Sequence, residues 1–558
     1  MFQWEDFKPE NPADIFWDVI VIGTGMGGST AGYALAKSNL NVLFVERGMP
    51  PDTYQQPSRW KRLKALLYPR DHEADLIARG RWPHQITIMK GHQAIHFYPP
   101  LGIGPGGSSA IYGAALERFR RVDFFKNRTT ANCRNILPDE WPIDFDEFAT
   151  YYAEAEKLYG ICGSHDPLDV DDTSVLLPAP PLSKKDENFY ESFKSLGLSP
   201  YRLHVGIAYE AGCTECQGIR CLRNCKAEAS SRCLKPALMR YNASVLFGCT
   251  VERIEMAGTQ AKAVVVKTSY FQTLRLRSRV VILAAGALFT PLLLLKSRSA
   301  KWPTGIGNSN DLVGRGLMFH ISDIFALWPT KRVDSIGPIK TLGSRAFYAV
   351  DDQKLGSFQS LGLGNARRHQ VFDFLDDCTQ LLGLTKLPFR WLFLQIVALF
   401  ASRLFINSAL FATILEDFPY LDNRVVVDDT KPSGFYILYN KSQELIDRTA
   451  LMRRLLKRAL APHRPFLLSV ANNINFGHPC GTCRFGSDPS TSVLDPNNRV
   501  HGVTNLFVLD GSFFPSSGGT NPSLTIAANA LRVAKIITKD HRAFERRDRT
   551  RGGSPSTS

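Results

Sequence analysis

The sequence predicts an α/β fold with a doubly wound, mostly parallel sheet of the kind that binds a dinucleotide. Three segments carry this prediction, because each runs from an apolar strand through a turn of small residues into a helical pattern. They lie at residues 18–46, 279–295 and 505–537. A length of 558 residues exceeds what one hydrophobic core usually spans, so we expect two or three folding units, some built from discontinuous pieces.

The first segment has the spacing of a dinucleotide-binding turn. An apolar run at residues 18–22 is followed by GTGMGG, an Ala-rich helical stretch and a second apolar run, NVLFVE. Gly23 permits the tight turn, Gly25 lets the backbone approach a pyrophosphate at the positive end of the helix, and Gly28 lets the helix pack on the sheet. Glu46 ends the second strand, where a carboxylate can accept hydrogen bonds from a ribose. Arg47 follows it and could favour a 2'-phosphate, so this unit leaves NADP open.

The late segment favours a flavin over a nicotinamide. Asp510 ends the strand NLFVLD, and a glycine-containing turn leads from it into a helix. FAD enzymes resemble this arrangement, with the late acidic residue bonded to the ribityl or pyrophosphate part of the flavin. A further glycine-rich loop at residues 102–109 has backbone N–H groups that could also face an anion.

Six motifs then occur in one order over nearly the whole chain: GTGMGG, PGGSSAIYGA, ILAAGALFTPLLLL, PYLDNRVVV, HPCGTCRFG and RVHGVTNLFVLDGSFFPSSGGTNPSLT. In this respect the chain resembles the glucose-methanol-choline (GMC) family of FAD-dependent oxidoreductases, and its choline dehydrogenase-like members. The resemblance implies an FAD-binding domain interleaved with an α+β substrate domain on an antiparallel sheet. We expect the FAD-binding domain at 13–125, 236–318 and 470–540, the substrate domain at 126–235 and 319–469, and a flexible tail at 541–558.

The resemblance also implies the activity, which is oxidation of a CH–OH group of an alcohol or sugar-like substrate to a carbonyl. The hydride would pass to the flavin and the hydroxyl proton to His478, in GHPCGTC, because a histidine pKa lies near working pH. Asn521, in GGTNPSLT, would hydrogen-bond the substrate oxygen. The alternatives are an oxygen-using alcohol or sterol-type oxidase and a non-catalytic flavoprotein.

The cofactor is expected to be FAD, bound without a covalent link. The glycine-rich loop has no obvious histidine for attachment, although His92 and His96 precede it, and Tyr112 stands where the family often has Asn. The residues expected at the cofactor are Gly23, Thr24, Gly25, Met26, Gly28, Glu46, Arg47, Gly106, Gly107, Ser108, Val251, Ala285, Asp510 and Gly511.

Five cysteines crowd into residues 213–233, and their spacing can wrap a soft metal ion or cluster. The segment resembles the cysteine-rich part of some GMC sugar dehydrogenases, in which an iron-sulfur cluster passes electrons outward. Cys216, Cys221 and Cys225 are the candidate ligands, with Cys213 as a further one, but their spacing differs from that of the family. Local disulfides or free buried thiols are the favoured alternative.

An apolar insert at residues 389–415 contains two charge-free stretches on either side of Arg403. Each stretch is too short to cross a bilayer, for which about 20 apolar residues are needed. We expect a buried pair of helices, with a substrate tunnel or a face resting on a membrane as the alternatives. The basic segment 59–70 could join such a face.

The net charge of +15 suggests an anionic neighbour. No nucleic-acid-binding module is recognisable, so we expect an anionic membrane surface or an acidic electron acceptor instead. The acceptor would be a quinone, a cytochrome or dioxygen. The chain begins with an acidic, polar stretch and without a classical signal peptide, which favours a cytoplasmic or peripherally membrane-associated protein.

Overall fold

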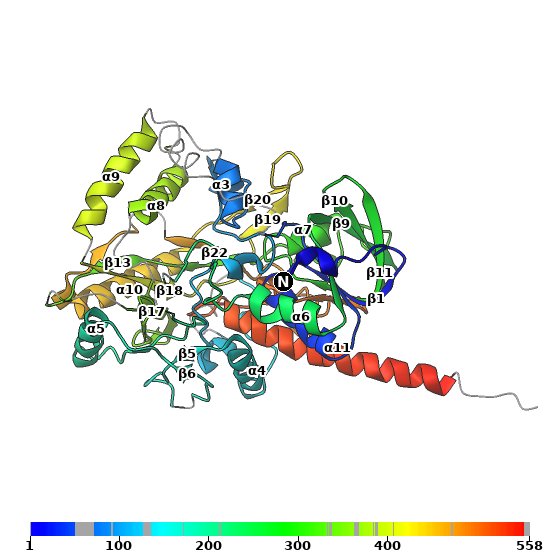
Figure 1. Cartoon of the computed structure of the whole chain (residues 1–558), viewed down its shortest axis with the longest axis horizontal. Helices are drawn as coiled ribbons and strands as arrows, with labels where there is room; N and C mark the ends of the chain where they lie inside the picture. Colours follow the sequence, from blue (N-terminus) through cyan, green and yellow to red (C-terminus); the bar gives the residue numbers. More distant parts are fainter. Residues whose placement is uncertain are drawn as a thin grey trace, which may run out of the picture.

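A computed structural model describes most of the chain (Figure 1). The described residues are 2–50, 72–90, 93–126, 135–170, 172–210, 212–213, 215–331, 333, 337–361, 368–382, 384, 389–405, 407–469 and 473–551. The basic segment 59–70 therefore lies outside them. Two large sheets organise the described part, one mostly parallel and one antiparallel, as the sequence predicts.

The first sheet has seven strands in the order β8-β2-β1-β11-β10-β9, with β23 paired to β11. β1 pairs in parallel with β2 and β11, β2 pairs in parallel with β8, and β11 pairs in parallel with β23. β10 and β9 extend the sheet beyond β11 as antiparallel strands. The four predicted strands, which are β1, β2, β11 and β23, are therefore confirmed. The strand bounds are Phe16–Ile22 (β1), Val42–Val45 (β2), Ala243–Leu246 (β8), Cys249–Ala257 (β9), Gln260–Thr268 (β10), Thr273–Leu283 (β11) and Leu506–Val508 (β23).

Helices α1 (Met26–Lys37) and α11 (Ser523–Arg551) pack against each other and against this sheet. Close packing requires glycine, since a β-carbon on Gly28 would lie 2.1 Å from the carbonyl oxygen of Gly23. Helix α11 continues to Arg551, into the range 541–558 that the sequence predicts as a flexible tail. Contacts from Arg499 to Asp540 and from His541 to Asp18, at 3.0 and 3.3 Å, lie where that range begins, and the flexibility of the tail stays a prediction. Residues 552–558 lie outside the described chain.

The second sheet has eight strands, all paired antiparallel, in the order β21-β13-β18-β17-β14-β7, with β12 joining β18 to β22. Helices α5 (Lys184–Ser195) and α10 (Gln443–Ala459) contribute to its core. This core includes the buried aromatic rings of Phe189 and Phe193 on α5 and of Phe358 and Phe411 on the sheet. The strand bounds are Tyr201–Arg202 (β7), Met318–Ile321 (β12), Ile324–Leu327 (β13), Leu342–Ser344 (β14), Gly356–Ser360 (β17), Ala409–Leu415 (β18), Phe466–Leu467 (β21) and Ile474–Cys480 (β22).

A third sheet joins early and late parts of the chain, because β3 (Ile86–Lys90) and β4 (Gln93–Phe97) pair with β20 (Phe435–Leu438), which in turn pairs with β19 (Arg424–Val427). The remaining helices and short strands are α3 (His72–Ala78), α4 (Phe145–Tyr159), α6 (Lys235–Arg240), α7 (Thr290–Lys296), β5 (Cys162–Gly163), β6 (Leu177–Pro178), β15 (Ala349–Val350) and β16 (Gln353–Lys354). The predicted domain boundaries stay a prediction.

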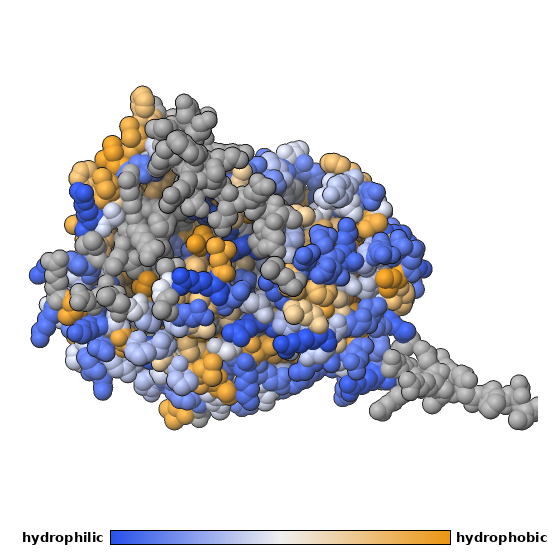
Figure 2. Space-filling model, in the orientation of Figure 1, coloured by the Kyte–Doolittle hydropathy of each residue, from blue (hydrophilic) through white to orange (hydrophobic). Residues whose placement is uncertain are grey.

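The prediction of a buried helix pair in the apolar insert is wrong. Its first half is the helix α9 (Arg390–Leu404), which packs on α8 (Arg368–Leu381) and leaves a broad apolar face exposed (Figures 1 and 2). Its second half is the buried strand β18, held between β13 and β17. A short apolar run cannot be assigned to helix or strand from periodicity alone. Among the described residues, no helix is long and apolar enough to cross a lipid bilayer.

Candidate active site

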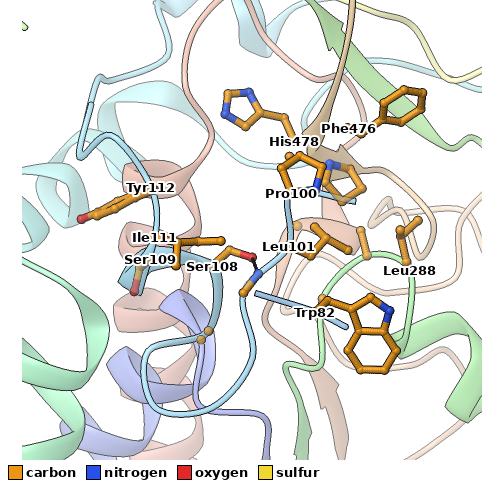
Figure 3. A pocket seen from close by; sticks show the side chains of 18 of the residues that line it. Trp82, Pro100, Leu101, Ser108, Ser109, Ile111, Tyr112, Leu288, Phe476 and His478 are labelled. Carbon is orange, nitrogen blue, oxygen red and sulfur yellow. Dashed lines mark hydrogen bonds between the residues drawn. The ribbon is translucent and has the colours of Figure 1, made fainter. Parts of the chain in front are cut away.

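A cavity of about 860 Å³ extends between the two large sheets. Its walls come from the carboxyl ends of β1, β2 and β11, from the second sheet near Ile324 and Ile414, and from β22. Figure 3 shows His478 and Phe476 at one end, Trp82 at the other, and the glycine-rich loop with Ser108 beside them. Ligands of open α/β sheets bind at the carboxyl ends of the strands, and ligand cavities usually measure about 300–1,000 Å³.

The structure brings most of the predicted site residues to this one cavity. Gly28 and Gly106 do not line it and act on the backbone instead: Gly28 allows the close approach of α1, and Gly106, at a φ of 87°, donates its N–H to the carbonyl of Thr24 at 3.1 Å. The predicted residues that line the cavity are Gly23, Thr24, Gly25, Met26, Glu46, Arg47, Gly107, Ser108, Val251, Ala285, Asp510, Gly511, His478, Asn521 and Cys216.

Gly25 caps the N-terminus of α1 and faces open space. Its φ of −72° suits any residue, and a β-carbon built there would meet no atom within 4 Å. A β-carbon on Gly27, two residues further along the same helix end, would lie 1.5 Å from the carbonyl oxygen of Leu509. Gly25 therefore borders room for a ligand at the positive end of the helix, where free N–H groups favour a phosphate.

Glu46 ties two loops of the cavity wall together. Its carboxylate accepts hydrogen bonds from the backbone N–H and the hydroxyl of Thr24, at 3.0 and 2.7 Å, and from the N–H of Gly104 at 3.2 Å. The guanidinium of Arg47 beside it lies 4.1 Å from the ring centre of Trp82 and 4.4 Å from that of Phe289. Burial lowers the pKa of Arg47 to about 10, although Glu46 opposes this shift. Arg47 is thus a cation held between two aromatic rings at the cavity wall.

Asp510 joins two strand ends of the parallel sheet. Its carboxylate accepts the N–H of Gly286 at 2.8 Å, the hydroxyl of Thr290 at 2.5 Å and the N–H of Ser512 at 2.9 Å. The turn after β11 is thereby fixed to the turn after β23. Burial raises the pKa of Asp510, and these hydrogen bonds oppose the shift.

His478 lies on β22 and meets a second histidine, His320, on the neighbouring strand β12. Their Nδ1 atoms are 3.1 Å apart, and the Nε2 atom of His320 is 3.1 and 3.0 Å from the carbonyl oxygens of Ser517 and Gly518. Asn475 places its amide nitrogen 3.3 Å from the same Nδ1 of His478, which is a longer contact. The antiparallel register, with His320 opposite Asn475, brings the two imidazoles together.

These contacts determine which ring nitrogens of His320 and His478 carry a proton. A carbonyl oxygen only accepts, so Nε2 of His320 carries a hydrogen. Burial lowers the pKa of His320 to about 4, so this ring is neutral at working pH and its Nδ1 accepts. Nδ1 of His478 must then donate to it, which leaves the lone pair on Nε2 of His478. Burial, His320 and Lys340 hold the pKa of His478 well below its ordinary value. The ring therefore presents a neutral, unprotonated nitrogen for accepting a proton.

Asn521 borders the same cavity, just before Pro522 and the start of α11. It is 8% exposed, and its Oδ1 atom has no hydrogen-bond partner among the described residues. A buried amide oxygen without a partner is costly, so the site suits a ligand that donates a hydrogen bond there.

Sequence reasoning missed His320, Trp82 and Lys340, all of which contribute to the site. His320 stands in MFHISDIFAL, where a single histidine in an apolar strand resembles an ordinary core residue. Tyr112 lines the cavity wall, and its hydroxyl donates to the carbonyl of Ala227. His96 does not line the cavity and hydrogen-bonds Thr87 at 3.0 Å, whereas His92 lies outside the described residues.

The candidate iron-sulfur site is not supported. Cys216 and Cys221 share a hydrogen bond, yet within the described ranges no group of three or more Cys, His, Asp or Glu side chains could hold a metal ion. The loop is organised instead by the buried ammonium of Lys226, which donates to the carbonyls of Tyr112, Cys216 and Ile219 at 2.9–3.1 Å. Of the candidate ligands, all of which lie among the described residues, only Cys216 lines the cavity, and none of Cys213, Cys216, Cys221 and Cys225 forms a disulfide there.

Known proteins share this sequence pattern and fold. Models described as GMC oxidoreductase match residues 19–322 and 441–530. The chain is 29% identical over 561 residues to paromamine 6'-oxidase of Streptomyces fradiae, covering 94% of this chain and 92% of the relative. It is 27% identical over 548 residues to 2-methyl-1,2-propanediol dehydrogenase of Mycolicibacterium austroafricanum, covering 94% and 95%. A solved formate oxidase of Aspergillus oryzae, in a study of FAD modification, shares the fold with a TM-score of 0.61 at 15% identity, covering 95% and 99%.

The two glycines at the start of α1 should respond differently to substitution. We expect Gly25→Val to fold with nearly unchanged thermal stability but to retain much less FAD, because the side chain fills the space beside the helix end. Gly27→Val, the matched control, should lower stability severely through its clash with the carbonyl of Leu509. Thermal unfolding and the flavin-to-protein absorbance ratio measure both effects. Full FAD occupancy in Gly25→Val would contradict the assignment of this end of the cavity.

Proposed function

The chain belongs to the GMC oxidoreductase family, and we propose that it is an FAD-dependent enzyme that oxidises a CH–OH group of an alcohol or sugar-like substrate to a carbonyl. The observation that carries this proposal is the shared cavity. The neutral base His478 and the unpartnered amide of Asn521 border the same cavity as the glycine turn of α1. A flavoprotein used only for binding would not need these groups beside the cofactor site.

The residues present fit FAD. The open space at Gly25 suits the pyrophosphate, Glu46 lies where a ribose would be, and the glycine-rich loop at residues 102–109 allows close approach of a flat ring. We propose non-covalent binding, because His96 does not border the cavity. When bound, FAD accepts the hydride that leaves the carbinol carbon.

The protein contributes the group that accepts the proton and the group that hydrogen-bonds the substrate oxygen. Nε2 of His478 takes the hydroxyl proton, and Nδ1 of His478 stays hydrogen-bonded to His320, which prevents the ring from turning. The amide nitrogen of Asn521 can donate to the substrate oxygen while that proton moves to His478, and then to the carbonyl oxygen that forms. His320 does not touch the substrate and is a positioning residue.

The electron acceptor is a quinone, a cytochrome or dioxygen. Dioxygen or a diffusing acceptor fits better than relay through an iron-sulfur cluster, because the described cysteines offer no metal site. Relatives are named as oxidases and as dehydrogenases. The choline dehydrogenase-like grouping stays a prediction, as does the division into an FAD-binding and a substrate domain.

We also propose a peripheral contact with a lipid bilayer through the outward face of α9. Phe393 and Phe400 on this face are 63% and 64% exposed, while Leu394 and Ala398 on the opposite face are buried. Figure 2 shows this apolar face as an orange ridge. The helix contains no Asp or Glu. Arg390 at its start is paired with Asp376 of α8, so the exposed Arg403 near its end is the charge that suits anionic lipid headgroups. Cys378 and Gln380 of the adjoining α8 line the cavity, so docking here would turn the cavity toward the bilayer.

The substitution His478→Ala tests the proposed base. We expect the variant to keep FAD but to be reduced by an alcohol substrate on the order of a hundredfold more slowly, because the hydroxyl proton loses its acceptor. Anaerobic stopped-flow absorbance measures flavin reduction. The control His96→Ala changes an exposed histidine outside the cavity and should leave the rate unchanged. Wild-type reduction rates in His478→Ala would remove His478 from the mechanism.

The pH dependence of flavin reduction should reflect the lowered pKa of His478. With a neutral alcohol, the rate should stay constant from pH 8 to about 6, because the base is still unprotonated there, and fall only in more acidic solution. The unfolded chain, whose histidines titrate near 6.5, binds more protons than the fold in acid, so the free energy of unfolding should decrease as the pH falls below 6.5. An acid limb of the rate centred near pH 6.5 would show that His478 has an ordinary pKa.

Vesicle flotation tests the membrane contact. We expect the protein to float with vesicles of phosphatidylcholine and phosphatidylglycerol, less with phosphatidylcholine alone, and hardly at all after the double substitution Phe393→Ser, Phe400→Ser. Phe271→Ser, which changes an 80% exposed phenylalanine on the far β10–β11 turn, is the matched control and should bind like the wild type. Equal flotation of the double variant and the control would exclude α9 as the contact.

A further inference from the structure

Lys340 is a buried cation that reaches the cavity without a partner. It is 5% exposed, it lines the cavity, and its ammonium forms no hydrogen bond or ion pair with the residues that the structure describes. It precedes the strand β14, and its main chain is anchored, because the carboxylate of Glu215 accepts the backbone N–H groups of Ile339 and Lys340 at 2.5 and 3.0 Å. The ammonium position is therefore set by the fold and is not that of a surface lysine.

The ammonium lies over the backbone of Gly113, directly after the glycine-rich loop. A β-carbon built on Gly113 would be 2.6 Å from Nζ of Lys340 and 3.3 Å from Oε1 of Gln217. Oε1 of Gln217 is itself buried and without a partner among the described residues. Two polar side chains thus flank Gly113 at the cavity with hydrogen-bonding capacity unused.

The charges around Lys340 leave its ammonium available. Glu215 uses its carboxylate on backbone N–H groups, and Glu117 is paired with Arg345 at 2.5 Å. Burial lowers the pKa of Lys340 to about 8, an effect that Glu215 and Glu117 oppose and Lys226 adds to, so the cation prevails at neutral pH. The positive charge also contributes to the low pKa of His478, which indicates that the two groups act on the same part of the cavity.

Among the described residues, no carboxylate at the cavity wall forms an ion pair with the ammonium of Lys340. The acidic residues that line the cavity are Glu46, Glu252 and Asp510; Glu46 and Asp510 are committed to backbone and hydroxyl donors, and Glu252 is exposed. A buried ammonium without a counter-charge is unfavourable until an anion or a strong acceptor arrives. The cavity therefore favours a ligand that brings such a group.

We propose that Lys340 forms a subsite for a carboxylate carried by the alcohol substrate, away from the carbinol carbon that is oxidised beside His478. The proposal rests on the function proposed above and narrows it to hydroxy acids in preference to neutral alcohols and amino alcohols. Lys340 pairs with the carboxylate through its ammonium. Lys340 thereby selects the substrate and takes no part in the proton transfer.

A series of three alcohols on one skeleton tests this subsite in the FAD-loaded enzyme: para-hydroxymethylbenzoate, benzyl alcohol and para-aminomethylbenzyl alcohol. We expect kcat/KM to fall in that order, by about tenfold or more from the acid to the amine. Lys340→Met should remove the preference while keeping FAD, and Lys340→Arg should preserve it. The same ranking in wild type and Lys340→Met would overturn the proposal, and loss of FAD from Lys340→Met would assign Lys340 to the cofactor instead.

Binding of benzoate separates this proposal from the reaction itself. Benzoate has no alcohol to oxidise, so its dissociation constant, measured from the perturbed flavin spectrum, reports the subsite alone. If none of the alcohols bleaches the flavin but benzoate binds at least about tenfold more weakly to Lys340→Met, the subsite stands and the proposed reaction fails. If alcohols bleach the flavin and benzoate binds both proteins equally, the reaction stands and the subsite is wrong.

Discussion

The hydrogen bond between His320 and His478 is the constraint on which the chemistry of this protein depends. It exists because β12 and β22 pair in one register, and because two backbone carbonyls, of Ser517 and Gly518, fix the proton on the far side of His320. The carbonyls require a proton on Nε2 of His320, so Nδ1 of neutral His320 is an acceptor, and this acceptor requires a proton on Nδ1 of His478. The result is a base whose free nitrogen is chosen by the fold and not by the solvent.

Buried carboxylates connect the loops that form the rest of the cavity wall through hydrogen bonds. Glu46 connects the turn of α1 to the glycine-rich loop, and Asp510 connects the ends of β11 and β23. Both bring together loops that are distant in sequence. Lys226 does the same for the cysteine-rich loop with its ammonium. Lys340 differs from these groups, because its charge is left for a ligand.

The sequence predicted the parts of the site that depend on local pattern. Glycine turns between an apolar strand and a helix require particular residues at particular spacings, so the dinucleotide unit, β11 and β23 could be inferred. The roles of His478 and Asn521 were implied by the resemblance to the GMC family. His320 and Lys340 could not be inferred, since each owes its role to strands paired across the second sheet. The prediction of two buried helices in the apolar insert was wrong for a related reason. The burial of β18 and the exposure of α9 depend on the elements packed beside them, which an apolar run does not reveal. The cysteine spacing likewise suggested a metal site, whereas the loop folds around Lys226.

Nitrogen-15 NMR of the histidines, assigned with His478→Ala and His320→Gln variants, tests the central claim most directly. Between pH 6 and 8 the account predicts that His478 is neutral, with the proton on Nδ1 and a bare Nε2, and that His320 is neutral with its proton on Nε2. A bare Nδ1 on His478, accepting from Asn475, would contradict it, and so would an imidazolium at either position. Either result would mean that the fold does not set the proton acceptor, and the proposed mechanism would lose its base.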